Sequence, residues 1–264
     1  MSTGPRQGIL PAMRLALMSD LHANLHALQA CLAHAREQQA THYAFLGDLV
    51  GYGADPGAVV DLVMGLADEG ALVLKGNHDD MAARPPGTCA QPTLGETTAR
   101  WTHDQLDAAQ RSFLDGLPMT QQLDRALLVH ATVDEPELWR YVYDAAAAGQ
   151  SLDAASAHEE VRYVFGGHVH RQSLYYRAAD GQLMPFTPTP GMPIPVSARR
   201  HWLATIGSVG QPRDGSPKAM YTLYDSEQSE LTFHRVAYDH HAAADAIRRA
   251  GLPDFFADRL EIGR

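Results

Sequence analysis

Residues 14–22 read RLALMSDLH, a short apolar run that leads directly into Asp and His, two residue types that bind metal ions. An apolar run of this length, followed at once by polar residues, predicts a buried strand over residues 14–18 that ends at a functional site. The spacing of leucines over residues 24–39 then predicts an amphipathic helix. Further strands are expected at 43–46 and 71–74, with a helix that starts at Pro56 between them. The chain therefore begins as β-α-β-α-β.

The rest of the chain continues with shorter elements. Strands are expected at 126–129, 161–165, 173–176, 202–206, 219–224 and 231–236, and helices at 94–114 (with a break near Ala108), 151–160, 240–250 and 254–260. Residues 84–93 and the proline-rich residues 184–195 are expected to form loops, the second of them exposed and irregular. We find no repeat and no Gly- or Ser-rich linker. A single domain over residues 14–264 is therefore predicted, after an N-terminal extension at residues 1–13.

Composition narrows the function classes. The chain has 264 residues, of which 45% are hydrophobic and 20% charged, as in ordinary globular domains. A formal net charge of -10 argues against a broadly basic surface, so strong nucleic-acid binding is not expected. Two cysteines, Cys31 and Cys89, cannot form a disulfide framework and favour a reducing compartment. Neither a membrane span nor a signal peptide is found in the sequence, so a cytoplasmic location is expected.

Five segments place Asp, Asn or His directly after an apolar run. They are Asp20-Leu21-His22, Gly47-Asp48, Gly76-Asn77-His78-Asp79, His130 and Gly167-His168-Val169-His170. Each is weak alone, since single Asp-x-His and Gly-Asp pairs are common on surfaces and in turns. Together they offer more ligand-type residues than one ion needs, so they predict a two-metal site. Carboxylate and imidazole ligands suit Zn, Fe or Mn, and the absence of cysteine disfavours a structural zinc site.

These motifs resemble the full signature of the calcineurin-like metallophosphoesterases. Four longer stretches are similar to one bacterial and archaeal branch of small stand-alone phosphoesterases: SDLHANLHAL (19–28), GDLVGYG (47–53), LLVHA (127–131) and GSVGQPRDG (207–215). The branch often has Asn-Pro before the last stretch, where this chain has Thr205-Ile206. The resemblance covers nearly the whole chain. It implies an α/β fold, a four-layer α/β/β/α sandwich of the metallophosphoesterase type, with its site at the strand ends.

The resemblance also implies two sets of metal ligands. Asp20, His22, Asp48 and His170 would hold one divalent ion, and Asp48, Asn77, His130 and His168 would hold the other, with Asp48 bridging. The two ions would share a water or hydroxide, which serves as the nucleophile. Mn is the expected metal, with Fe, Zn, Co and Ni as alternatives.

Residues near the ligands are assigned to catalysis and substrate binding. His78 is expected to contact a phosphate oxygen or to protonate the leaving group. Asp79 is expected to orient His78, with a surface carboxylate as the alternative. Asn77 is expected to contact the substrate as well. Tyr52 is expected either to contact the substrate or to pack in the core, and Arg213 either to pair with a phosphate or to be a surface arginine.

Other polar and aromatic residues receive no place in the site. Asn24 is expected to stabilise the first loop through a bond between its side chain and the backbone. Trp139 is expected to anchor the core or a lid rather than to stack on a base. His26, His34 and His234 have no partner at a spacing that indicates a ligand.

The predicted activity is dimetal-dependent hydrolysis of phosphate esters, with phosphodiesters as the first substrate class. Hydrolysis of dinucleoside polyphosphates such as diadenosine tetraphosphate, or of nucleotide monoesters, is the alternative. A non-catalytic metal-binding scaffold is disfavoured, since every ligand position and His78 is present. Nuclease action on long DNA fits poorly with the net charge of -10. The expected partner is a small phosphate ester or nucleotide, and the oligomeric state stays open.

Overall fold

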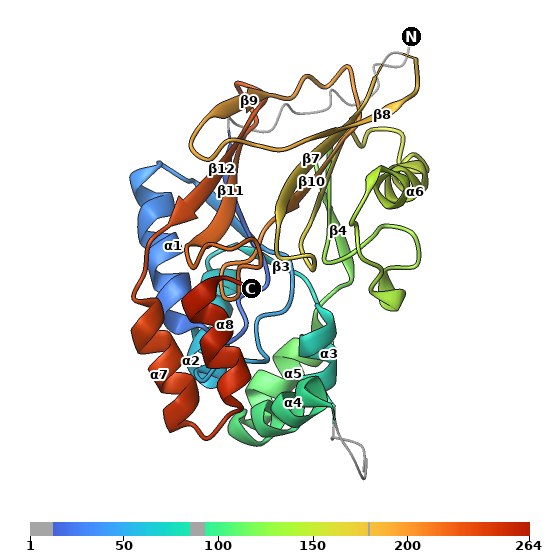
Figure 1. The fold of residues 1–264 in the computed structure, drawn as a ribbon. Coiled ribbons are helices and arrows are strands. Elements are labelled where there is room, and N and C mark those ends of the chain that lie inside the picture. Colours follow the sequence, from blue (N-terminus) through green and yellow to red (C-terminus); the bar gives the residue numbers. More distant parts are fainter. Residues whose placement is uncertain (1–12, 85–92, 179) are drawn as a thin grey trace.

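The computed structural model describes residues 13–84, 93–178 and 180–264. The N-terminal extension, apart from Met13, lies outside the described residues, as do Cys89 and nearly all of the loop expected at 84–93. In the described part of the chain, two six-stranded sheets pack face to face, and helices cover their outer surfaces (Figure 1). The predicted four-layer α/β/β/α sandwich is confirmed.

The first sheet has the order β3-β2-β1-β11-β12-β9. Its strands are β1 (Arg14–Met18), β2 (His42–Phe45), β3 (Leu72–Val73), β9 (Pro193–Pro195), β11 (Ala219–Asp225) and β12 (Glu230–Val236). Side chains of β1 alternate between two cores, because Leu15 and Leu17 face the second sheet while Ala16 and Met18 face helices. Both faces of β1 are buried, which explains its continuous apolar sequence.

The second sheet has the order β4-β5-β6-β10-β7-β8. Its strands are β4 (Thr120–Leu123), β5 (Ala126–Val129), β6 (Tyr163–Gly166), β7 (Gln172–Arg177), β8 (Leu183–Phe186) and β10 (Trp202–Ile206). β5, β6 and β10 are parallel, as are β1, β2 and β3 in the first sheet. The loops that follow parallel strands therefore gather at one edge of each sheet.

Helices complete the outer layers (Figure 1). They are α1 (Leu25–Glu37), α2 (Pro56–Asp68), α3 (Asn77–Ala83), α4 (Leu94–Gln105), α5 (Ala108–Gly116), α6 (Ala145–Ala155), α7 (His240–Arg249) and α8 (Asp254–Ile262), with a 3-10 turn at Pro136–Leu138. Helix α1 buries Leu28 and Leu32 against the first sheet, and α6 buries Leu152 against the second. None of the helices in the described ranges has the length and hydropathy to cross a bilayer.

Asn24 begins α1 as predicted. Its Oδ1 accepts a hydrogen bond from the N–H of Ala27 at 3.1 Å, which caps the helix. Its Nδ2 donates to the carbonyl oxygen of Gly210 at 2.9 Å. The side chain therefore ties the loop after β1 to the loop after β10.

Two local predictions were right only in part, and one strand was not expected. Residues 187–192 form the exposed irregular segment that was predicted, but the flanking residues belong to β8 and β9 at the outer edges of the two sheets, where proline costs no ladder hydrogen bond. The helix expected at 151–160 begins at Ala145, after Asp144 caps it through the N–H of Ala147 at 2.9 Å. The polar strand β4, with sequence TQQL, was not expected, since it lacks an apolar pattern.

Candidate metal centre

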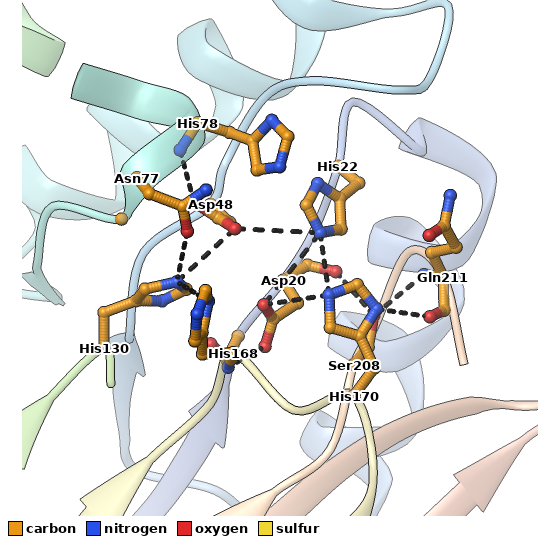
Figure 2. Close-up of polar contacts among 12 residues, drawn as sticks. Asp20, His22, Asp48, Asn77, His78, His130, His168, His170, Ser208 and Gln211 are labelled. Carbon is orange, nitrogen blue, oxygen red and sulfur yellow. Dashed lines mark hydrogen bonds and ion pairs between the residues drawn. The ribbon is translucent and has the colours of Figure 1, made fainter. Parts of the chain in front are cut away.

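The structure brings all seven candidate metal ligands together where strands of both sheets end (Figure 2). Asp20 and His22 follow β1, Asp48 follows β2, Asn77 follows β3, His130 follows β5, and His168 and His170 follow β6. Asn77 is half-buried and the other six are buried. The centre is therefore assembled from loops that are far apart in sequence.

One group of ligand atoms lies at the end of β1. Oδ1 of Asp20 is 3.3 Å from Nε2 of His170 and 3.9 Å from Nε2 of His22. The two Nε2 atoms lie 3.1 Å apart. Three ligand atoms therefore converge on one point, as a bound cation requires.

A second group lies at the end of β5. Nε2 of His130 is 3.3 Å from Oδ1 of Asn77 and 3.2 Å from Nδ1 of His168. Asp48 joins this group to the first, because its Oδ2 lies 3.4 Å from Nε2 of His130 and 3.8 Å from Nε2 of His22. One carboxylate oxygen is therefore shared between the two groups (Figure 2).

The second nitrogen of each histidine ring bonds to the main chain. His22 Nδ1 donates to Val50 O (3.1 Å), His130 Nδ1 to Leu46 O (2.7 Å), His168 Nε2 to Trp139 O (2.9 Å) and His170 Nδ1 to Gln211 O (2.6 Å). A carbonyl oxygen only accepts, so these nitrogens carry the hydrogen and the opposite nitrogens keep a free lone pair. Hydrogen bonds of this kind orient histidine ligands in metal sites.

In each of the two carboxylates, Asp20 and Asp48, one oxygen likewise accepts a main-chain N–H and the other faces the ligand atoms. Oδ2 of Asp20 accepts from the N–H of His168 at 2.9 Å, and Oδ1 of Asp48 accepts from the N–H of His78 at 2.8 Å. Oδ1 of Asp20 is buried and, among the described residues, has no hydrogen-bond partner. A buried acceptor without a donor is costly unless a cation satisfies it. The residues present therefore fit a divalent metal ion.

Charge within the centre also suits a cation. Burial lowers the pKa of His22, and burial with the neighbouring His130 lowers the pKa of His168 to about 4, so both rings are neutral. Burial alone would lower the pKa of His130, but the Asp48 and Asp20 carboxylates raise it to about 9. Burial opposes ionisation of Asp48, yet the surrounding imidazoles hold its pKa well below its usual range. The centre thus places ionised carboxylates among imidazoles, of which His22 and His168 are neutral and His130 holds its proton more tightly until a cation displaces it.

Backbone strain concentrates at the ligands. Five of them have left-handed φ values between 46° and 67°: Asp20, His22, Asp48, His168 and His170. Such angles are uncommon for non-glycine residues, although Asp and His adopt them more readily than most, and they are found preferentially at functional sites. Glycines make room beside them, since a Cβ on Gly76 would lie 2.2 Å from Oδ1 of Asp48.

His78 lies directly beside the ligands. Its ring centroid is 5.0 Å from that of His22 and 4.3 Å from that of Tyr52. Its Nδ1 is buried and lacks a hydrogen-bond partner in the described part of the chain, and burial lowers the pKa of the ring. Ligand-type atoms of His22, Asp48 and His78 also lie within 4.8 Å of one another. His78 is therefore within reach of whatever the centre binds.

Asp79 does not occupy the place that we expected. It is fully buried, so it is not a surface carboxylate. Its oxygens accept from the N–H groups of Gly76 and Leu49, each at 2.9 Å, and they make no hydrogen bond to the ring of His78. Burial and the nearby charge of Asp48 raise its pKa to about 7. Asp79 therefore fastens the loop after β2 to the loop after β3.

Tyr52 and Arg213 lie at the border of the centre. The Tyr52 ring is 4.6 Å from the His22 ring and stacks on Phe256 at 4.7 Å, so it contacts both the centre and the core. The guanidinium of Arg213 is 6.0 Å from the Tyr52 ring centroid. Its Nη2 donates to Oε1 of Gln211 at 2.9 Å, a neutral partner that leaves its charge uncompensated.

Sequence reasoning missed an aromatic segment that supports His168. The Tyr141 ring stacks on the His168 ring at 4.0 Å, and Tyr143 stacks on Tyr141 at 4.9 Å. Trp139 supplies the carbonyl oxygen that fixes His168, and its ring lies 5.8 Å from that of His130. The alternation of aromatic residues at 139, 141 and 143 was the available signal, because alternate residues of an extended segment face the same side.

Comparisons with known proteins agree with this geometry. The calcineurin-like phosphoesterase superfamily domain matches residues 13–229. An uncharacterised protein of Methanocaldococcus jannaschii is 30% identical over 254 residues, which cover 95% of this chain and 98% of that protein.

Two crystal structures are similar over nearly the full length. A metallophosphoesterase from Sphaerobacter thermophilus is 33% identical, with a TM-score of 0.83 and coverage of 96% of this chain and 100% of that one. A hypothetical protein from Pyrococcus horikoshii is 19% identical, with a TM-score of 0.75 and coverage of 95% and 98%, and shares the fold.

Proposed function

The chain belongs to the calcineurin-like phosphoesterase superfamily and is a metal-dependent phosphoesterase, and we propose that it hydrolyses small phosphodiesters at two divalent cations. The position of Asp48 carries this proposal. Its Oδ2 lies 3.8 Å from Nε2 of His22 and 3.4 Å from Nε2 of His130, between two groups of ligand atoms. A carboxylate shared in this way suits a pair of adjacent cations.

Each cation would have its own ligands besides the shared one. Asp20, His22 and His170 would hold the first with Asp48, and Asn77, His130 and His168 would hold the second with Asp48. The mixture of imidazole, carboxylate and amide donors supports Mn as the metal, with Fe, Zn, Co and Ni as competitors. When bound, the cations would lower the pKa of a water molecule and polarise the phosphoryl group.

His78 would act on the substrate. The main-chain N–H of His78 donates to Oδ1 of Asp48, which fixes the start of α3. Its imidazole, 5.0 Å from the ring of His22, would donate a hydrogen to a phosphoryl oxygen or to the departing oxygen. Asn77 would contribute its amide N–H₂ to a phosphate oxygen while its Oδ1 faces the cation. Asp79 would keep these residues in place through its hydrogen bonds to the main chain at Gly76 and Leu49.

The substrate would approach along Tyr52 and Arg213. The Arg213 guanidinium can donate two parallel hydrogen bonds to a phosphate, and the Tyr52 ring separates it from the ligands. The expected substrates are small phosphate esters.

Metal replacement tests this proposal. The protein is stripped with a chelator, refilled with Mn, Fe, Zn, Co, Ni or Mg, and assayed with bis(p-nitrophenyl) phosphate and p-nitrophenyl phosphate. We expect the stripped protein to be inactive and Mn to restore the highest kcat/KM, with the diester preferred. The Asp48→Asn variant, treated identically, serves as the control and should stay inactive with every metal. Full activity of the stripped protein, or preference for the monoester, would contradict the proposal.

A further inference from the structure

An open cavity of about 790 Å³ lies beside the metal centre, bounded by the start of β7, by β12, by residues 213–215 and by α8. Its volume is within the range of cavities that hold small molecules. The proposed chemistry at the metal centre uses Arg213 from its lining and gives its other arginines no role.

Positive charge dominates the lining of this cavity. Five arginines line it, namely Arg171, Arg213, Arg235, Arg259 and Arg264, against a single acidic side chain, Asp214. The chain as a whole carries a formal net charge of -10, so this local excess of positive charge opposes the general balance. Such an arrangement concentrates anions at one place on an otherwise acidic protein.

The arginines are incompletely paired. Arg235 forms an ion pair with Asp214. Arg171 donates through Nε to the carbonyl oxygen of Arg213 at 2.9 Å, and Arg213 donates to the side-chain oxygen of Gln211. These last two acceptors are neutral, so neither compensates a guanidinium charge. Arg259 donates through Nε to the main-chain oxygen of Arg264 at 2.5 Å, which leaves its two terminal N–H₂ groups for a ligand. Within the described residues, no acidic side chain forms an ion pair with Arg171, Arg213 or Arg259.

The charges of two arginines act on each other across the cavity. Burial lowers the pKa of Arg259, and the neighbouring charge of Arg213 lowers it further. An anion bound between them would remove this repulsion. Guanidinium groups bind phosphate through parallel hydrogen bonds, which a carboxylate-poor cavity leaves available.

Arg213 connects the cavity to the metal centre. Its backbone N–H donates to the carbonyl oxygen of His170 at 3.2 Å. Its guanidinium lies 6.0 Å from the ring of Tyr52, and that ring is 4.3 Å from the ring of His78. The same arginine thus borders both the proposed site of hydrolysis and the cavity.

We propose that this cavity binds a second phosphate group of the substrate, so that the preferred substrates are phosphoesters that carry a further phosphate away from the scissile bond. The proposal rests on the proposed function for the identity of the scissile group. Arg171 and Arg259 supply the hydrogen bonds to the second phosphate, and Arg213 lies between the two phosphate positions. Arg235 lines the same cavity and forms an ion pair with Asp214.

Two chromogenic diesters that differ by one phosphate test this proposal. They are thymidine 5′-(p-nitrophenyl phosphate) and the same compound with a 3′-phosphate, which share the scissile bond and the leaving group. With the Mn-loaded enzyme, we expect kcat/KM to be about tenfold higher for the 3′-phosphorylated compound, the effect of one charge-assisted hydrogen bond. Arg259→Gln and Arg171→Gln should bring the ratio close to one without changing kcat/KM for the compound that lacks the 3′-phosphate.

Arg199→Gln is the matched control, since it removes the same charge from a cavity elsewhere on the molecule, and it should leave the ratio unchanged. Equal kcat/KM for both compounds in the wild type, or an unchanged ratio in Arg259→Gln, overturns the cavity proposal while the proposed function stands. If neither compound is hydrolysed, the proposed function fails instead. Calorimetric binding of thymidine 3′,5′-bisphosphate and thymidine 5′-monophosphate to the Mn-loaded protein then decides the cavity, and equal affinities reject it.

Discussion

The Nε2 atoms of His22 and His170 face each other at 3.1 Å, although Nδ1 of each ring already donates its hydrogen to a main-chain carbonyl. With the hydrogens held on Nδ1, the Nε2 lone pairs of the two rings are directed at each other, which is repulsive. A cation held by both nitrogens turns this repulsion into attraction. The contact therefore links metal binding to the stability of the fold.

Metal removal should destabilise the protein. A ligand at about 100 times its Kd stabilises the folded state by about 2.7 kcal/mol, and each kcal/mol shifts Tm by about 2–4 °C in a domain of this size. We expect the chelator-treated protein to melt roughly 5–10 °C below the Mn-loaded protein in differential scanning fluorimetry. Asp48→Asn should show a smaller difference between the two conditions. Superimposable wild-type melting curves would exclude a cation from this contact.

Replacement of Asp48 should affect both metal positions. Since its Oδ2 lies between the two groups of ligand atoms, Asp48→Ala should abolish activity and reduce the bound metal at both positions. Metal content per chain, measured by inductively coupled plasma mass spectrometry, checks this. His26→Ala is the control, because His26 is half-buried on α1 outside the centre, and it should keep both metal and activity. Equal loss in the two variants would refute the assignment of Asp48.

His78 should contribute to chemistry without holding metal. We expect His78→Asn to keep its metal content and to lose activity by about 10²–10⁴-fold, the usual worth of general acid–base help. The loss should be smaller for p-nitrophenyl esters, because p-nitrophenolate departs without protonation, and larger for alkyl diesters. Metal analysis and kcat for both ester types separate the roles. Loss of one metal ion from the variant would make His78 a ligand.

Tyr141 should set the affinity of the second metal position. Its ring stacks on His168 at 4.0 Å, and residues that orient ligands in this way typically change metal affinity by about 10–100-fold. Tyr141→Ala should therefore weaken Mn binding at one position, while Tyr141→Phe, which retains the ring, should not. Titration with Mn, followed by activity and by calorimetry, measures the effect. Equal Mn affinity in the two variants would remove Tyr141 from this role.

His234 should make the fold sensitive to acid. Burial and the nearby His34 lower the pKa of His234 to about 4. In the unfolded chain its pKa returns to about 6.5, so the unfolded state binds more protons between these values. Stability from His234 is thus present above about pH 6.5 and is lost as pH falls towards about 4. His234→Phe keeps the stack on Tyr221 and should flatten this dependence in urea unfolding; parallel pH curves for the two proteins would contradict it.

The arrangement of ligands was predictable because it depends on local pattern. Each candidate ligand follows an apolar run, and parallel strands bring the ends of such runs to one edge. The bounds of β1 and β10 agree with the expected strands at 14–18 and 202–206 for the same reason. A buried strand is recognisable from its own residues, because almost all of them are apolar.

Features that depend on distant partners were not predictable. Asp79 is buried by the loop after β2, some thirty positions earlier, and no local pattern indicates that its acceptors are main-chain N–H groups. The stacking of Tyr141 on His168 likewise joins residues 27 positions apart. The arginine-lined cavity is formed by residues of β7, β12 and α8, which are far apart in the sequence, so no local pattern indicates it.

Both sheets supply ligands to one centre, so the complete set of metal ligands exists only when the two sheets have docked. Four of the seven ligands, Asp20, His22, Asp48 and Asn77, follow strands of the first sheet, while His130, His168 and His170 follow strands of the second. A chain in which only one sheet has formed therefore lacks donors for both metal positions until the sheets dock. A cation bound there would then cross-link the two sheets through its ligands. Metal binding is thus a direct measure of whether the two sheets are docked.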